Sequence, residues 1–323
     1  MYNFDPEFNI KVFEEKRNIR KCGNTVGVLM LIIKLIALFV SFIIGTLSLV
    51  FVGDTETFQN LIKDDLVFSN ITNIIINAFV MFAPFLLFAI YTSKGNSYNL
   101  SFSRPKTNNK DTAKYILFAM FLSYVAGLVR LIVSALFSFV IGKEPYVPEL
   151  GASYSNATIA IIVEIICTGI LTALIEEFAF RGVLLTYLRK FGDVPAIVVS
   201  SLVFAVLHGN FVQIPYVFVL SSGLAFITIK TGSIYPAIFV HFVNNSIATL
   251  YSWVPDATTI FSFVIMVASV LSTYTLIKQN KLSLPKTQNY VLSNSKRTEI
   301  LITSPFLLVY LIYEVITSLN FIK

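Results

Sequence analysis

Apolar runs long enough to cross a bilayer recur along this chain, and they constrain its fold more than any other feature. An α-helix needs about 20 apolar residues to cross the hydrocarbon core. Only helices and closed barrels satisfy their backbone hydrogen bonds there. The pattern predicts an all-α fold, a polytopic transmembrane helix bundle with about eight to nine membrane helices. The predicted spans are residues 25–52, 66–91, 115–142, 157–181, 194–208, 211–229, 233–251, 257–278 and 299–321.

The basic residues are distributed unevenly between the two ends of these spans. The net charge of +6 would by itself allow a nucleic-acid partner. If the N-terminus is inside and the spans alternate, 18 of the 24 Lys and Arg residues fall in inside segments and 3 in outside segments. This is the positive-inside pattern. We therefore expect a multi-pass protein of the cell membrane with a cytoplasmic N-terminus, in contact with the lipid bilayer and with no nucleic-acid partner.

The polar segments are too short to form further domains. We predict a cytoplasmic N-terminal tail over residues 1–24 and a single membrane domain over residues 25–323. Two polar and basic loops, residues 92–114 and 279–298, are expected on the inside, and loops of this length lack a core of their own. Lys34 and other basic residues within apolar runs are expected to snorkel or to pair inside the bundle.

One predicted span is unusually short. It has only 13 residues from Pro195 through Leu207, a rise of about 20 Å, before the sequence His208-Gly209-Asn210. A helix break at membrane depth is tolerated only against protein or a water-filled cavity. Two interpretations stay open: His208 ends a helix inside such a cavity, or the span is short and tilted with His208 at the outer interface.

Four ionisable side chains in neighbouring apolar segments predict a functional site. Glu176 and Glu177 begin the sequence EEFAFRG, and the only two histidines of the chain, His208 and His241, lie in later apolar segments. Ionisable groups within a membrane are costly, and they usually face a bundle interior or an aqueous cavity. A lone buried histidine is more often a core residue, but this set is harder to explain by packing alone.

Helical spacing assigns partners to some of these groups. Glu177 and Arg181 are four residues apart with the acid first, which favours a pair on one helix face. Glu176 points about 100° away from that face, so it is left to act as a general base or acid. His241 and Asn245 are also four apart, and together they present donors that can stabilise an oxyanion.

The sequences EEFAFRG, FAVLH and HFVNN occur in this order, and together they resemble the three motifs of a known family. That family is the CAAX-endopeptidase and bacteriocin-processing (Abi) family of intramembrane proteases, whose pattern is EExxxR, FxxxH, and HxxxN or HxxxD. All three motifs match, within a catalytic core of about residues 155–250. The resemblance implies a site between membrane helices that hydrolyses peptide bonds near the cytoplasmic membrane face.

Carried over by motif, the resemblance implies four catalytic residues. Glu176 would be the base that activates a water molecule, helped by His208. His241 and Asn245 would hold the oxyanion. The expected partner is a peptide or protein substrate, either lipid-modified or embedded in the membrane, whose identity the sequence leaves open.

The resemblance also implies supporting roles for Glu177 and Arg181, and it raises the question of a metal. Two histidines and a carboxylate suit zinc. The ligands would then be Glu176, His208 and His241. However, the sequence H-E-x-x-H is absent, and a metal-free glutamate mechanism also gives the asparagine a role. We favour no metal and no cofactor, with zinc as the alternative.

Two other function classes remain open at this point. Chains of Glu and His residues also serve as proton relays in membrane transporters. A proton-coupled transporter predicts inverted repeats and broken helices in both halves, whereas the sequence offers one candidate break. The second alternative is a non-catalytic membrane scaffold or immunity protein on the same fold. The intact set of Glu, His and Asn residues argues against it.

The charge pattern generates a prediction about orientation. Cysteines introduced at Ser97 and Ser293, in the two inside loops, should not react in intact cells with an impermeant thiol reagent. A cysteine at Lys143, in a predicted outside segment, should react. The unmodified chain, which carries only Cys22 and Cys167, gives the background. Labelling of both inside positions from outside would reverse the predicted topology.

Overall fold

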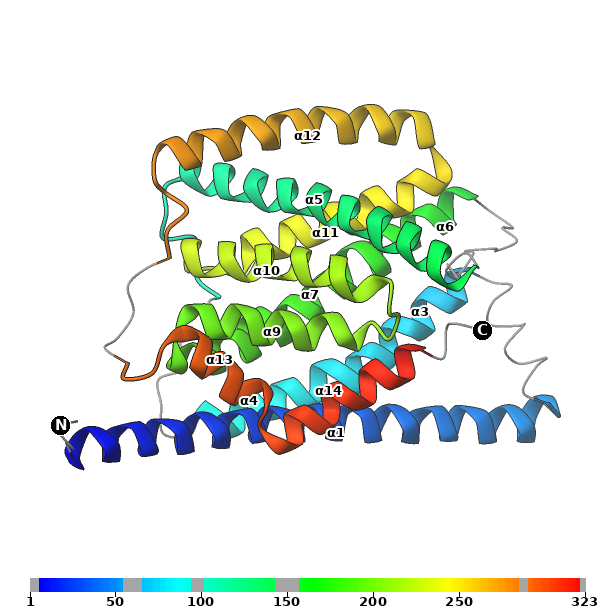
Figure 1. Ribbon diagram of the computed structural model, residues 1–323. Coiled ribbons are helices and arrows are strands. Elements are labelled where there is room, and N and C mark those ends of the chain that lie inside the picture. The colour runs from blue at the N-terminus through cyan, green and yellow to red at the C-terminus, as the bar shows by residue number, and fades with distance from the viewer. Residues whose placement is uncertain (1–5, 55–65, 94–101, 143–156, 285–289, 320–323) are drawn as a thin grey trace.

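Helices form all the regular structure of the described residues. The computed structural model describes residues 6–54, 66–93, 102–142, 157–284 and 290–319, and no strand occurs among them. Each of the predicted spans coincides with helical structure, so the all-α prediction is confirmed. Figure 1 shows the helices lying side by side along one common direction, as expected for a membrane helix bundle.

Several helical segments of the described chain are long and apolar enough to cross a membrane. A bent pair, α13 (Asn294–Ile302) and α14 (Pro305–Ser318), adds one span if its two helices are counted together. The 15-residue helix α9 (Asp193–Leu207) is shorter, and α11 (Tyr235–Trp253) is not among the candidates. The predicted count of about eight to nine is therefore not confirmed. The six candidates are Glu7–Phe51, Val67–Ser93, Asn109–Ile141, Thr158–Phe191, Gln213–Thr231 and Pro255–Lys278.

The first helix, α1 (Pro6–Val52), extends beyond the predicted span. Its 47 residues rise about 70 Å, more than twice the hydrocarbon thickness. Residues 6–24, predicted to be a polar tail, form the first turns of this helix. The polar part of α1 therefore continues out of the membrane layer as a helix, at the end of the bundle where residues 189–193 and 278–284 also lie (Figure 1).

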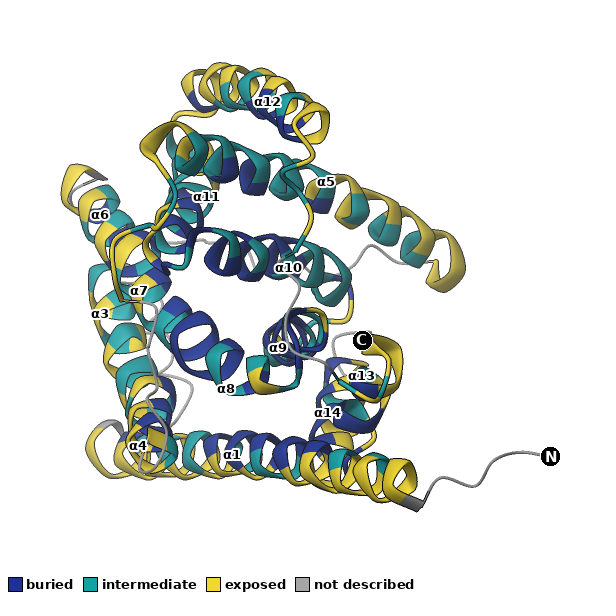
Figure 2. Ribbon diagram, turned by 90° about the vertical axis from the view of Figure 1, so that its left-hand side faces the viewer, coloured by how far each residue is buried: buried dark blue, intermediate teal, exposed yellow. Residues whose placement is uncertain are grey.

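The bundle has two halves, each with its own cluster of buried hydrophobic residues. One half of the bundle consists of four helices that pack on one another: α5 (Asn109–Ile141), α10 (Gln213–Thr231), α11 and α12 (Pro255–Lys278). In the other half, α1 packs against α13 and α14, and these pack against α9, which also contacts the helical segment Phe178–Leu188. In Figure 2 the buried residues line the inner faces of these helices, and the exposed residues lie on the outer helices and at their ends.

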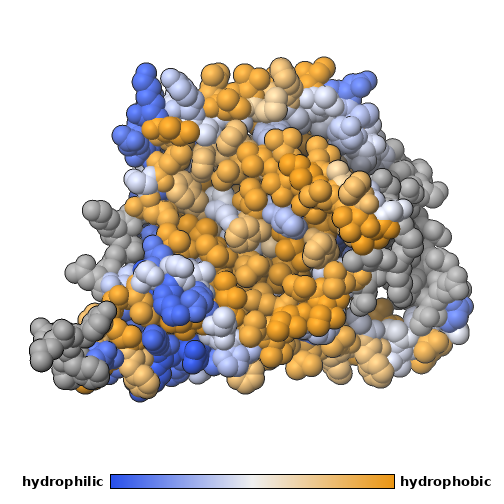
Figure 3. Space-filling view, in the orientation of Figure 1, coloured by the Kyte–Doolittle hydropathy of each residue, from blue (hydrophilic) through white to orange (hydrophobic). Residues whose placement is uncertain are grey.

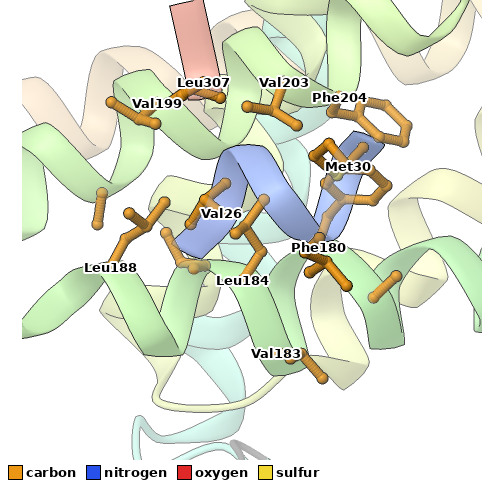
Figure 4. Packing of buried hydrophobic residues seen from close by; sticks show 14 of the residues in the cluster. Val26, Met30, Phe180, Val183, Leu184, Leu188, Val199, Val203, Phe204 and Leu307 are labelled. Carbon is orange, nitrogen blue, oxygen red and sulfur yellow. The ribbon is translucent and has the colours of Figure 1, made fainter. Parts of the chain in front are cut away.

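The larger hydrophobic cluster joins helices that are far apart in the sequence. Val26 and Met30 of α1 are fully buried against aliphatic side chains of two other helical segments and α14 (Figure 4). Burying a side chain of this size contributes about 1.5–3 kcal/mol in a water-soluble protein, and inside lipid the same contacts act through close packing. Their labelled neighbours in the cluster are Phe180, Val183, Leu184, Leu188, Val199, Val203, Phe204 and Leu307.

Two glycines let α1 approach the break between α13 and α14. A Cβ at Gly23 would overlap Ser304, and one at Gly27 would overlap the backbone of Leu307. Glycines four residues apart allow close approach of membrane helices in this way. Asn24, which lies between them, accepts a hydrogen bond from the backbone N–H of Phe306 at 3.1 Å and so caps the first turn of α14.

The predicted pairing of basic residues within apolar runs is confirmed where the structure describes it. Lys34 Nζ lies 2.8 Å from Glu314 Oε1 on α14. Arg130 lies over the ring of Tyr216, 5.6 Å from its centroid. Both contacts link helices of the bundle, so neither residue requires a functional role. Of the predicted inside loops, residues 94–101 and 285–289 lie outside the described residues.

The glycine contacts predict a difference between two substitutions in α1. Gly27→Ala should destabilise the protein by about 1–3 kcal/mol, because the added methyl group meets backbone that cannot move aside. Gly45→Ala, in the same helix, has no atom within 4 Å of its new methyl group and should be neutral or stabilising. Thermal unfolding in detergent measures both. Equal melting temperatures would show that α1 does not approach α14 this closely.

Candidate active site

The helical span from Thr158 to Phe191 is not a uniform α-helix. The pair Glu176-Glu177 ends the short helix α7 (Thr172–Glu177), and a π-helix lies on either side of it. π-helical turns are rare and occur frequently at functional sites, because they shift side chains relative to an ordinary helix. The complete order is α6 (Ala157–Glu164), η2 (Ile165–Leu171), α7, η3 (Phe178–Leu185), α8 (Thr186–Leu188) and η4 (Arg189–Phe191).

The ion pair predicted between Glu177 and Arg181 is present and fully buried. Arg181 Nη1 donates to Glu177 Oε1 at 2.8 Å, and neither side chain is more than 1% exposed. Arg181 Nη2 donates to the backbone oxygen and the hydroxyl of Ser221 on α10, at 3.2 and 3.0 Å. The guanidinium also stacks over the ring of Phe204 at 4.9 Å. The arginine therefore neutralises Glu177 and ties its helix to α9 and α10.

His241 lies between the two glutamates. Its Nδ1 is 2.8 Å from Glu177 Oε1, and its Nε2 is 3.6 Å from Glu176 Oε2. Because a carboxylate bound to arginine can only accept, Nδ1 carries the proton of that hydrogen bond. Nε2 is thereby directed at Glu176. The sequence pattern left Glu176 without a partner, whereas the fold gives it this imidazole.

The Glu177–Arg181 pair is neutral by itself, and Glu176, 17% exposed, faces Nε2 of His241. A proton can pass between this carboxylate and this imidazole without changing the net charge of the cluster, because a carboxylic acid beside a neutral imidazole and a carboxylate beside an imidazolium carry the same total charge.

His208 lies directly after α9, where both sequence interpretations place the end of this span. The helix ends at Leu207, and His208 Nδ1 lies 3.0 Å from the carbonyl oxygen of Phe204. A carbonyl can only accept, so Nδ1 carries a proton and Nε2 is the basic nitrogen of the neutral ring. The rings of Phe204 and His208 pack edge-on with their centroids 4.9 Å apart, and the histidine is exposed. The ring of Phe204 also lies 6.3 Å from that of His241.

Asn245 contacts the π-helix that precedes the glutamates. Its Nδ2 donates to the backbone oxygen of Thr168 in η2 at 3.0 Å. The hydroxyl of Thr168 lies 3.1 Å from Asn70 Oδ1 on α3 (Leu66–Asn77). A primary amide has two N–H donors, so this contact occupies one of them. Asn245 thus ties α11 to η2, and its second N–H remains a candidate donor.

The zinc alternative requires three ligands at one point. Among the residues that the structure describes, no group of three or more His, Cys, Asp or Glu side chains is arranged to hold a metal ion. Glu176 and His241 lie together, but His208 does not complete a ligand set with them. The donor set named for zinc is therefore not assembled in this conformation.

Two buried polar residues of the helices that carry this site were not singled out in the sequence. Glu164 is 5% exposed, and it accepts a hydrogen bond from the Trp253 indole N–H at 3.2 Å. Its position within the same apolar run as Glu176 was the available signal. Ser221, which binds Arg181, had no such signal, because a serine in an apolar helix is common.

The comparisons with known proteins agree with the motifs. Residues 158–247 match the family model described as type II CAAX prenyl endopeptidase Rce1-like, so the resemblance seen in the sequence is confirmed over this segment. All the predicted site residues fall within the match. No curated protein and no solved structure matches the chain significantly. At the level of the family, the match supports a CAAX-type intramembrane protease.

The buried pair generates a prediction about stability. Arg181→Ala leaves Glu177 as an unpaired buried charge, which should cost about 3–5 kcal/mol of unfolding free energy. The double variant with Glu177→Gln should regain part of this loss, because the charge is then removed. Thermal unfolding in detergent measures both variants.

Lys296→Ala is the control for this measurement. It breaks an exposed pair with Glu299, which contributes about 0–1 kcal/mol. If Arg181→Ala were as stable as Lys296→Ala, the buried pair would have no structural role.

Proposed function

We propose that this protein is an intramembrane endopeptidase that hydrolyses peptide bonds near the cytoplasmic membrane face through a water activated by Glu and His side chains. The family match supports the class of enzyme. The observation that carries the mechanism is the position of His241, which contacts Glu177 through Nδ1 and faces Glu176 through Nε2. A base, an imidazole and an orienting carboxylate in this order are the elements of a general acid–base site.

Glu176 is the proposed base. Its carboxylate takes a proton from water while the resulting hydroxide attacks the carbonyl carbon of the scissile peptide bond. His208, whose Nε2 is unprotonated in the neutral ring, orients this water. Glu177 holds His241 in one tautomer, a role that a buried carboxylate plays in other acid–base sites.

The oxyanion of the tetrahedral intermediate requires donors that are already in place. We assign this role to Nε2–H of His241, in the state in which Glu176 is a carboxylate and the imidazole is protonated on both nitrogens, and to the second N–H of Asn245, which lies one helical turn away on α11. The proton that Glu176 accepted then passes to the leaving nitrogen as the C–N bond breaks. The products are a carboxylic acid and an amine. The proposed partner is therefore a peptide or protein substrate, either lipid-modified or embedded in the membrane.

The assignment of the base predicts the effect of Glu176→Gln. This change keeps the size and hydrogen bonding of the side chain but removes the base, so cleavage should fall by about 10²–10⁴-fold. The melting temperature should stay close to that of the unmodified protein. Peptidomics of membranes from cells with either chain measures turnover and reveals the substrate. Glu299→Gln, at an exposed position, is the matched control. Unchanged cleavage in Glu176→Gln would refute this role.

The mechanism as proposed uses no metal. Purified protein should keep its cleavage activity after dialysis against a chelator, and elemental analysis should find no stoichiometric zinc. Incubation of the dialysed protein with zinc should leave the rate unchanged. Activity that is lost on dialysis and restored by zinc alone would instead make Glu176, His208 and His241 metal ligands.

A further inference from the structure

A groove on the membrane-facing surface runs between α1 and the segment formed by η1 (Ala78–Phe82) and α4 (Ala83–Ser93). It has a volume of about 440 Å³ and nearly all of its lining is apolar, including Ile32 and Leu87. The part of α1 that lines it, residues 25–36, rises about 16 Å. That is half of the ~30 Å hydrocarbon core. The groove therefore has the depth of one leaflet, which suits an acyl chain.

A basic depression adjoins the groove at the end of the bundle. The two share the lining residues Thr25, Val28 and Tyr91. A third depression, which contains Lys21 and Lys190, also includes Tyr91. Figure 3 shows hydrophilic residues gathered over the first part of α1 and α13, beside a broad hydrophobic face. The basic residues of the second depression are Lys16, Arg17, Arg20 and Lys21.

These four basic side chains have no acidic partner among the described residues. The nearby Glu15 accepts instead from the backbone N–H groups of Val291 and Leu292, at 2.9 and 3.3 Å. Lys281, at the same end of the bundle, is by contrast paired with Asp111 at 2.7 Å. The mouth of the groove thus holds positive charge that the described protein does not neutralise.

We propose that the groove and its basic mouth bind one anionic phospholipid of the surrounding membrane. The phosphate would lie among Arg17, Arg20 and Lys21, and an acyl chain would fill the groove along Ile32. A lipid with no net charge would leave the basic residues uncompensated. A peptide in the groove would lose the hydrogen bonds of its backbone to an apolar lining. This proposal does not depend on the proposed hydrolysis.

The headgroup contacts are tested by lipid titration of the purified full-length protein in detergent, with native mass spectrometry to count bound lipids. Phosphatidylglycerol should bind saturably as one molecule, and phosphatidylcholine should not. The variant R17Q/R20Q/K21Q should bind phosphatidylglycerol about a hundredfold more weakly, because each basic residue near an anionic lipid strengthens binding about fivefold. A control with the same charge loss changes three exposed basic residues outside the groove, in the variant R104Q/K110Q/K278Q, and should bind normally.

The acyl-chain contact has its own matched pair of variants. Ile32→Trp fills the groove and should weaken phosphatidylglycerol binding, whereas Leu35→Trp, exposed on α1 but outside the groove, should not. Inorganic phosphate should fail to compete. Equal losses in the two charge variants would show diffuse attraction and overturn the proposal. The proposal would also be overturned if the two tryptophan variants bound phosphatidylglycerol with equal affinity, or if the unmodified protein bound phosphatidylcholine as tightly as phosphatidylglycerol. Melting temperatures confirm that each variant is folded.

Discussion

The buried ion pair of Glu177 and Arg181 is the interaction on which the rest of the site depends. Two charges inside a membrane bundle are tolerated only if they neutralise each other and their remaining polar atoms find partners. Arg181 meets this condition by binding Ser221 on α10. Glu177 meets it in part: its Oε1 accepts from both Arg181 and His241 on α11, whereas its buried Oε2 has no hydrogen-bond partner among the described residues. Because each partner comes from a different helix, neutralising one pair also sets the relative position of three helices. Glu176 is positioned as a consequence, opposite the second nitrogen of the same imidazole.

The π-helical segments explain how one helix can serve both structure and chemistry. A π-turn leaves backbone carbonyls with altered partners, and Asn245 uses one of them, that of Thr168 in η2. The two glutamates are adjacent in the sequence, yet Glu177 is fully buried and Glu176 is 17% exposed. This difference fits the two proposed roles: the buried Glu177 carboxylate holds the imidazole of His241, and the Glu176 carboxylate remains accessible to water.

The long helix α1 joins the interior of the bundle to its membrane surroundings. One face of α1 buries Val26 and Met30 in the core. Gly23 and Gly27, which lack side chains, allow α14 to approach the helix closely. The face toward η1 and α4 is left as a groove, and the polar extension supplies the basic mouth. The same 47-residue helix therefore stabilises the bundle and offers the surface on which we place an anionic lipid.

The sequence by itself determined what depends on neighbours along the chain. Hydropathy located the helices, because the bilayer sets their length, and the Glu177–Arg181 pair followed from spacing of one helical turn. The three motifs also pointed to the family whose model matches residues 158–247. Tertiary structure alone decided that His241 lies between Glu176 and Glu177, and that the last predicted span is broken by a 72° bend. Such contacts join residues far apart in sequence, and only the packing of whole helices brings them together.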